Sequence, residues 1–216
     1  MTPAATVALV LAAVAAVVNW WAVAAGRRAV EVVAKPTATA ALVVVAATAG
    51  TMDTEARVAL VVAVVFGLLG DVALLGSSEA RFLGGLGAFA IGHAAYVVTA
   101  LLVGISWPWT LVGVPFMIVL LVWRFAPETV PGARRAGGAV LAGAVLGYAT
   151  VISAMVLSAA GTRSVLAAVG AMAFAVSDWL LGFDRFVRPI RNGRVAVMVT
   201  YHTGQALLIL GLALTD

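Results

Sequence analysis

The run Ala56-Arg-Val-Ala-Leu-Val-Val-Ala-Val-Val-Phe-Gly-Leu-Leu-Gly-Asp-Val-Ala-Leu-Leu75 is apolar except for Arg57 near its start and Asp71 near its end. A helix needs about 20 predominantly apolar residues to cross a bilayer, and this run has that length. The rest of the chain has the same character, with 64% hydrophobic and 10% charged residues and a mean hydropathy of +1.14. A typical soluble domain is about 25% charged. We therefore predict an all-α integral membrane protein.

Similar apolar runs on both sides of this one predict a bundle of eight transmembrane helices, ended by polar residues, glycine or proline. No linker is long enough to separate domains, so residues 1–216 are expected to form a single domain, whose oligomeric state stays open. Pro127 to Pro131 is expected to break the chain between two spans, and Pro36 to lie in a first helical turn. The expected spans are Ala4–Ala25, Val33–Gly50, Ala56–Leu75, Arg81–Val103, Trp107–Phe125, Ala136–Ala160, Thr162–Phe183 and Arg194–Leu214.

The basic residues predict the orientation of this bundle. Only Arg57 and Arg163 fall in even-numbered loops. The odd-numbered loops hold all the others: Arg27, Arg28, Lys35, Arg81, Arg124, Arg134, Arg135, Arg185, Arg188, Arg191 and Arg194. Because basic loops stay in the cytoplasm, we expect odd loops inside and both termini outside, in the inner or plasma membrane of the cell. This scatter at span ends favours a membrane lipid partner and argues against nucleic acid.

Small residues recur along the expected helices. They form the patterns Gly67-x-x-Gly70, Gly84-Gly85-Leu-Gly87 and Gly143-x-x-x-Gly147. Small side chains let helix backbones approach closely in lipid, so these glycines are expected at helix contacts.

Asp71 and Asp178 are ionisable groups inside apolar spans. Such a group costs about 2.5–3.5 kcal/mol on insertion scales and usually marks a functional interior. At a rise of about 1.5 Å per residue, Asp71 lies about 6 Å and Asp178 about 8 Å from the cytoplasmic ends of their helices. Both helices run from outside to inside, so the two aspartates are expected at one level. The two segments also resemble each other weakly, as an internal repeat would.

Further polar residues are expected in the same half of the bundle. Lys35 lies at its cytoplasmic mouth, Asn19 and Tyr201 lie about 9 and 10 Å deep, and Gln205 and His93 lie about 16 and 18 Å deep. Each has a structural alternative, since these side chains also pack or bond between helices and a lysine also sets topology. His202 points about 100° away from Tyr201 around their helix.

The residue types narrow the chemistry. The chain has no cysteine, no Gly-x-Ser-x-Gly and no His-x-x-x-His spacing, so we expect no thiolate chemistry, no metal and no cofactor. Burial favours the protonated form of a carboxyl, and two neighbouring carboxylates cannot both ionise cheaply. An aspartate pair in an apolar site therefore favours acid–base catalysis.

Several short motifs, taken in order, resemble the YhhN-type lysoplasmalogenase family over nearly the whole chain. They are Lys35-Pro36, Gly70-Asp71-x-x-Leu74, Phe82-x-x-Gly85-x-x-x-Phe89-x-x-x-His93-x-x-Tyr96, Phe174-x-x-Ser177-Asp178-x-Leu180 with Arg185-Phe186, and Tyr201-x-x-x-Gln205.

The resemblance implies hydrolysis of the vinyl-ether bond of a lysophospholipid, which gives a fatty aldehyde and a glycerophospho-ethanolamine or -choline. We expect either Asp71 or Asp178 to be the acid, and the other to stabilise the cation and orient water. Lys35 would meet the lipid phosphate. His93, Tyr201 and Gln205 would hold water or tune the carboxyls, with Tyr96 and Asn19 as further supporting residues.

Two other interpretations of the same aspartates remain open. Paired intramembrane carboxylates also serve as proton relays, so a proton-coupled small-molecule or lipid transporter is the main alternative. A purely structural membrane protein is the other.

Overall fold

The computed structural model describes residues 2–50 and 52–215, and every regular element in this part of the chain is a helix. Seven helical stretches are long and apolar enough to cross a membrane. In order, the helices are α1 (Pro3–Ala24), α2 (Arg28–Ala47), α3 (Thr54–Leu74), α4 (Glu79–Val103), α5 (Trp107–Thr110), α6 (Gly113–Leu120), η1 (Leu121–Thr129), α7 (Val130–Gly161), α8 (Val165–Phe186) and α9 (Gly193–Ala213).

The longest of the seven stretches, Trp107–Gly161, has 55 residues and turns back on itself. Its two ends are adjacent, because the Ser106 N–H donates to the Gly161 carbonyl oxygen at 2.8 Å. The reversal lies at Gly137 and Gly138, whose backbone leaves the helical region, with φ of +68° at Gly138. The predicted break at Pro127 to Pro131 is therefore wrong. The π-helical η1 runs through Pro127, and the chain turns where glycine allows a positive φ. The eight-span topology and its orientation stay predictions.

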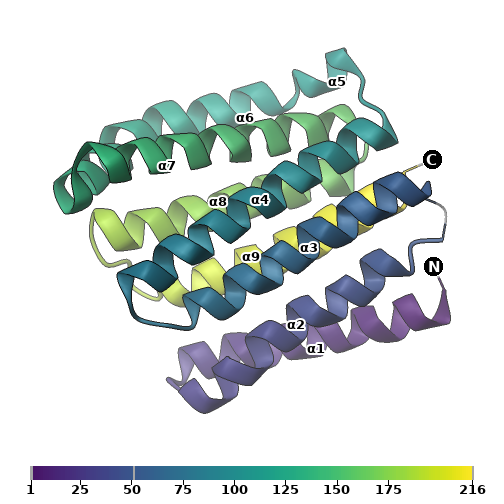
Figure 1. Cartoon of the computed structure of the whole chain (residues 1–216), viewed down its shortest axis with the longest axis horizontal. Coiled ribbons are helices and arrows are strands. Elements are labelled where there is room, and N and C mark those ends of the chain that lie inside the picture. The colour runs from purple at the N-terminus through teal and green to yellow at the C-terminus, as the bar shows by residue number, and fades with distance from the viewer. Residues whose placement is uncertain (1, 51, 216) are drawn as a thin grey trace.

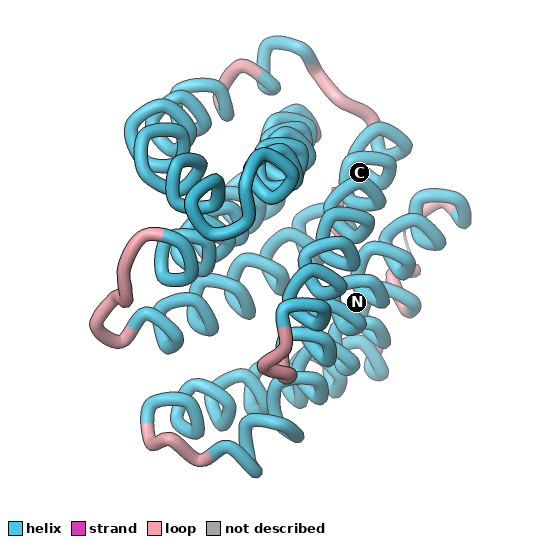
Figure 2. The backbone as a smooth tube through the Cα atoms, turned by 60° about the vertical axis from the view of Figure 1, so that its left-hand side comes forward, coloured by secondary structure: helices cyan, strands magenta, loops and turns pink. Residues whose placement is uncertain are grey.

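The helices pack as hairpins that close into a ring (Figure 1). The pairs α1–α2, α3–α4 and α8–α9 make the most extensive contacts. Helix α2 contacts α3, α4 contacts α7, α7 contacts α8, and α9 contacts α1. Helix α6 and η1 lie against α7 at one side of this ring, and short loops join the helices (Figure 2). The ring brings α2, α3, α4, α8 and α9 around a common interior.

Helix α2 begins at Arg28, earlier than the predicted Val33. In its first turn, Arg28 Nη1 and Glu31 Oε2 form an ion pair of 3.0 Å. The charges of these two residues made the segment too polar to be predicted as part of a span. Pro36 consequently lies inside the helix and not in its first turn. Because Pro36 has no N–H, the α2 backbone lacks one hydrogen bond at the residue that follows Lys35.

Helices α8 and α9 approach so closely that glycine is required at their contact. A Cβ on Gly170 would lie 2.3 Å from the Leu208 backbone nitrogen, and one on Gly204 would lie 2.6 Å from the Phe174 nitrogen. Gly67, Gly70 and Gly85 likewise face tight neighbours, as predicted. Gly84, Gly87, Gly143 and Gly147 have no atom within 4 Å of a built Cβ, so the prediction that these four mediate helix packing is wrong.

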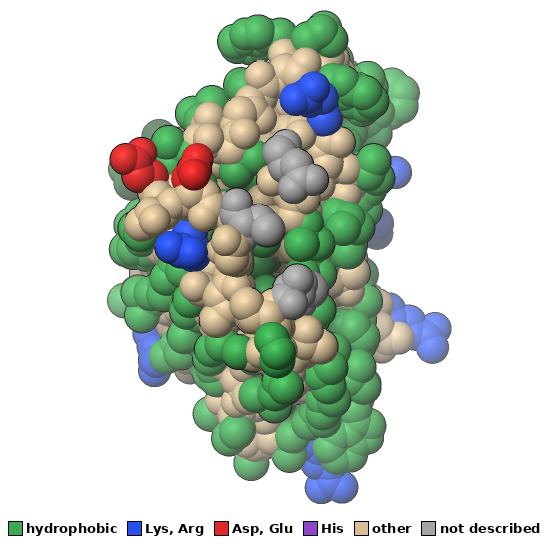
Figure 3. All heavy atoms as spheres, turned by 90° about the vertical axis from the view of Figure 1, so that its right-hand side faces the viewer, with side chains coloured by type: hydrophobic (Ala, Val, Ile, Leu, Met, Phe, Trp, Pro, Cys, Tyr) green, Lys and Arg blue, Asp and Glu red, His purple; other side chains and the backbone are tan. Residues whose placement is uncertain are grey.

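The outer surface carries large apolar side chains, as lipid-facing helices require. Val140, Trp107 and Trp123 are 85%, 75% and 69% exposed. Figure 3 looks onto the end of the bundle that bears the termini, where charged side chains are sparse and hydrophobic side chains surround the rim.

We expect Gly170→Ala to lower the stability of the protein, because its Cβ would collide with the α9 backbone and overpacking costs about 1–3 kcal/mol. Thermal unfolding in detergent micelles measures the effect. The matched control is Gly143→Ala, which adds the same group to open space and is expected to leave the unfolding temperature unchanged or slightly higher. Equal unfolding temperatures for the two variants would contradict the close α8–α9 contact.

Candidate active site

Asp71 is fully buried near the end of α3 and is compensated by three partners. Lys35 Nζ lies 3.1 Å from its Oδ1. The Thr39 hydroxyl donates to Oδ2 at 2.5 Å, and the Tyr201 hydroxyl donates to the same oxygen at 2.7 Å. Lys35 and Thr39 are four residues apart on α2, so they share one helix face. The Asp71 carboxyl group thus accepts two hydrogen bonds from hydroxyl groups and pairs with an ammonium group.

Asp178 on α8 has a different set of partners. His93 Nε2 of α4 lies 3.0 Å from its Oδ2, and the same nitrogen lies 3.2 Å from the Tyr148 hydroxyl of α7. His93 is buried, whereas the Asp178 side chain keeps 9% of its surface exposed. His93 Nε2 donates to these oxygens when it carries a hydrogen and accepts when it does not, so the direction of both contacts depends on the His93 tautomer.

Two phenylalanine rings lie between these clusters. The Phe174 ring centroid is 4.7 Å from that of His93 and 5.2 Å from that of Tyr201. The Phe89 centroid is 6.3 Å from that of His93 and 5.7 Å from that of Tyr201. No hydrogen bond joins the two carboxylates within residues 2–50 and 52–215. The two aspartates therefore have separate hydrogen-bond partners and are not hydrogen-bonded to each other.

Both aspartates nevertheless line one cavity of about 420 Å³. One part of its wall is apolar, formed by Leu74, Phe82 and Leu181, and another is polar or charged. The polar lining comprises Glu31, Lys35, Asp71, Ser77, Ser78, Ser177, Asp178, Asp184, Arg185, Arg194 and Tyr201. The cavity therefore offers both polar and apolar surface to a ligand.

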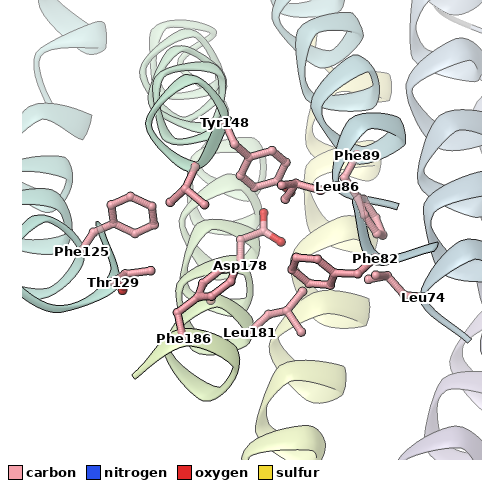
Figure 4. A pocket seen from close by; sticks show the side chains of 12 residues that line it. Leu74, Phe82, Leu86, Phe89, Phe125, Thr129, Tyr148, Asp178, Leu181 and Phe186 are labelled. Carbon is pink, nitrogen blue, oxygen red and sulfur yellow. The ribbon is translucent and has the colours of Figure 1, made fainter. Parts of the chain in front are cut away.

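A second, smaller pocket of about 30 Å³ adjoins Asp178 (Figure 4). The Asp178 carboxylate points into it, among Tyr148, Leu86 and Phe82. Phe125 and Phe186 complete an almost entirely apolar lining. Asp178 therefore faces apolar side chains in this pocket and the partly polar lining of the larger cavity.

The structure brings together only some of the predicted site residues. Asp71, Lys35 and Tyr201 form one cluster, and Asp178 and His93 form the other. Lys35 is 4% exposed and bound to Asp71, so its predicted place at the mouth is wrong.

Three further predicted residues stay outside these hydrogen-bonded clusters. Tyr96 and Gln205 are buried deeper, and the Gln205 amide lies against Gly67, where a Cβ would approach Nε2 to 2.8 Å. Asn19 is fully buried but does not line the cavity.

His202 faces away from the cavity, as its offset from Tyr201 predicted. The Trp20 indole N–H donates to His202 Nδ1 at 3.0 Å and to the Met198 carbonyl at 3.1 Å. This side of α9 therefore packs against α1.

Sequence reasoning missed Thr39 and Tyr148 as partners of the aspartates. Thr39 had a detectable signal, because it follows Lys35 by one helical turn. Tyr148 had none, since nothing in the sequence relates α7 to His93. Sequence reasoning also missed Glu31, which forms an ion pair of 2.7 Å with Arg194 at the cavity, and it used Arg194 only to predict orientation.

Comparisons with known proteins agree with the motifs. The model of the YhhN family matches residues 30–212. Lysoplasmalogenase TMEM86B of Sus scrofa is 28% identical over 139 residues, covering 61% of this chain and 54% of that protein. Lysoplasmalogenase TMEM86A of Bos taurus is 30% identical over 154 residues, covering 69% of this chain and 62% of that protein. The chain thus spans less than two thirds of the length of these relatives. No solved structure matches it significantly.

We expect Lys35→Met and Asp71→Asn each to destabilise the protein by about 3–5 kcal/mol, because each leaves or unbalances a buried charge. The double variant should lose much less than the sum of the two, since it removes both charges. Thermal unfolding of the four proteins in detergent measures this coupling. Strictly additive losses would contradict a buried ion pair.

Proposed function

The chain belongs to the YhhN family, and we propose that it is a membrane-embedded hydrolase that cleaves the vinyl-ether bond of lysoplasmalogens. The products are a fatty aldehyde and a glycerophospho-ethanolamine or -choline. The names of the curated relatives support a hydrolase of this family. The observation that carries the proposal is that two differently partnered carboxylates face one cavity with both charged and apolar walls.

A vinyl ether is hydrolysed by protonation of its β-carbon, which creates an oxocarbenium ion at the carbon bonded to oxygen. Such a reaction needs a group that can donate a proton to carbon. It also needs a nearby negative charge that stabilises the oxocarbenium ion. The two clusters offer one group of each kind.

Asp178 is the proposed acid. His93 Nε2 lies 3.0 Å from its Oδ2, close enough to exchange a proton with it, and Asp178 lines the larger cavity, which would hold the alkenyl chain. Transfer of this proton to the β-carbon leaves the Asp178–His93 pair one proton short. Water then adds to the oxocarbenium carbon and returns a proton to the same pair, which serves as base in this second step.

Asp71 is the proposed counter-charge. The Thr39 and Tyr201 hydroxyls donate to it and the Lys35 ammonium group pairs with it, so its surroundings favour a negative charge at this place. A fixed carboxylate stabilises the oxocarbenium ion without reorganisation at the moment of reaction. The hemiacetal formed by water addition then collapses, with proton exchange through Asp178, to the aldehyde and the glycerol hydroxyl.

Aldehyde release from an alkenyl lysophospholipid by the protein in liposomes tests the proposal. We expect Asp178→Asn to reduce turnover by about 100- to 10,000-fold, the usual contribution of a general acid. The matched control is Asp53→Asn, the same substitution at an exposed residue before α3, which should keep full activity.

Two outcomes would contradict the proposal. One is a folded Asp178→Asn protein with wild-type turnover. The other is a wild-type protein that releases no aldehyde but takes up solute in response to a proton gradient, which would favour the transporter.

A further inference from the structure

Resting on the proposed function, we infer that Arg185 and Arg194 form a binding site for the phosphate of a single-chain glycerophospholipid. This site would take over the role expected of Lys35, which is buried in its ion pair with Asp71. Both arginines line the 420 Å³ cavity that the two aspartates share.

The position of the arginines follows from the α8–α9 hairpin, whose helices lie side by side (Figure 1). Arg185 follows Asp178 by seven residues on α8, and Arg194 precedes Tyr201 by seven residues on α9. Seven residues are about two helical turns, so each pair shares a helix face with an axial separation of about 10 Å. Because the helices are antiparallel, both arginines lie at the same end of the cavity, on the same side of the two carboxylate clusters.

This separation matches the substrate. Five bonds connect the vinyl-ether oxygen to the phosphorus of a lysophospholipid, through the three glycerol carbons. At about 1.5 Å per bond, with tetrahedral angles, they extend over about 6 Å. A guanidinium–phosphate hydrogen bond adds about 2.8 Å. A lipid whose vinyl ether lies beside Asp178 therefore places its phosphate within reach of these arginines.

The charges around the cavity also leave Arg185 available. Of the four acidic residues in the lining, Asp71 is bound by Lys35 and Asp178 by His93. Glu31 is bound by Arg28 and Arg194. Asp184 accepts the Ile190 backbone N–H at 2.7 Å. Within the described residues no carboxylate pairs with Arg185, whose guanidinium lies 4.9 Å from the Phe82 ring centroid.

Arg194 can bind a phosphate only if it leaves its ion pair with Glu31. Its Nη2 lies 2.7 Å from Glu31 Oε1, and its side chain is 62% exposed. Arg28 holds the other oxygen of Glu31 at 3.0 Å, so Glu31 keeps a cationic partner when Arg194 turns to a phosphate. A phosphate bound between Arg185 and Arg194 would thus replace the contact of Arg194 with Glu31 by charge-assisted hydrogen bonds from both arginines.

Binding of uncleavable ligands tests this site without relying on turnover. The probes are hexadecyl-glycerophosphocholine, a saturated ether with the phosphate, and hexadecylglycerol, which lacks it. Titration of the protein in maltoside micelles, followed by tryptophan fluorescence, gives the dissociation constants. We expect Arg185→Gln and Arg194→Gln each to raise the constant for the phosphate lipid about 10- to 100-fold, since each removes a charged hydrogen bond. The constant for hexadecylglycerol should stay within about twofold.

The control is Arg191→Gln, which removes an exposed arginine between α8 and α9 that does not line the cavity and should change neither constant. Unchanged binding of the phosphate lipid by both variants would overturn the inference, as would an equal loss for both probes. Inorganic phosphate alone is the third probe. If it displaces the phosphate lipid at micromolar concentration, the site serves free phosphate and the lipid assignment is wrong. If the enzyme assay succeeds, the two variants should raise KM for the alkenyl lipid and leave kcat nearly unchanged.

Discussion

The buried ion pair between Lys35 and Asp71 is the constraint on which the rest of the site depends. Two charges inside a membrane bundle are tolerated only when each is compensated, and here the Thr39 and Tyr201 hydroxyls complete the compensation. The pair joins α2, α3 and α9 at one depth. It also occupies Lys35, the residue that the sequence suggested for a lipid phosphate.

Each aspartate has a hydrogen-bond partner on the helical hairpin that carries the other aspartate. Asp71 on α3 is bound by Tyr201 of the α8–α9 hairpin, and Asp178 on α8 is bound by His93 of the α3–α4 hairpin. Phe89 and Phe174 lie between the clusters and keep the two hydrogen-bond networks apart. The result is an asymmetric pair of carboxyl groups, one opposite a fixed cation and one opposite a titratable imidazole. Such a difference in environment is what allows two identical side chains to take different chemical roles.

The chain belongs to the YhhN family, and the two relatives that it matches are named lysoplasmalogenases, which supports the proposed function. The shared cavity gives this a physical basis, because its lining combines apolar residues with arginines and carboxylates. Close packing of α8 on α9 through Gly170 and Gly204 holds Asp178 and Tyr201 in place around it. Stability of the hairpin and geometry of the site are therefore coupled.

The sequence alone determined the class of the fold and pointed to the two aspartates that line the cavity. Apolar runs of membrane length specify helices regardless of their neighbours, and the cost of an intramembrane charge singles out Asp71 and Asp178. It misplaced the break near Pro127, because a π-helical stretch accommodates the proline and two glycines reverse the chain later. It could not identify the partners of each aspartate. Hydrogen bonds from Tyr201 to Asp71 and from His93 to Asp178 span 130 and 85 residues, so they exist only once helix packing has chosen which faces meet. Periodicity gives the face of a helix but not its neighbour, and that neighbour decided the chemistry of the site.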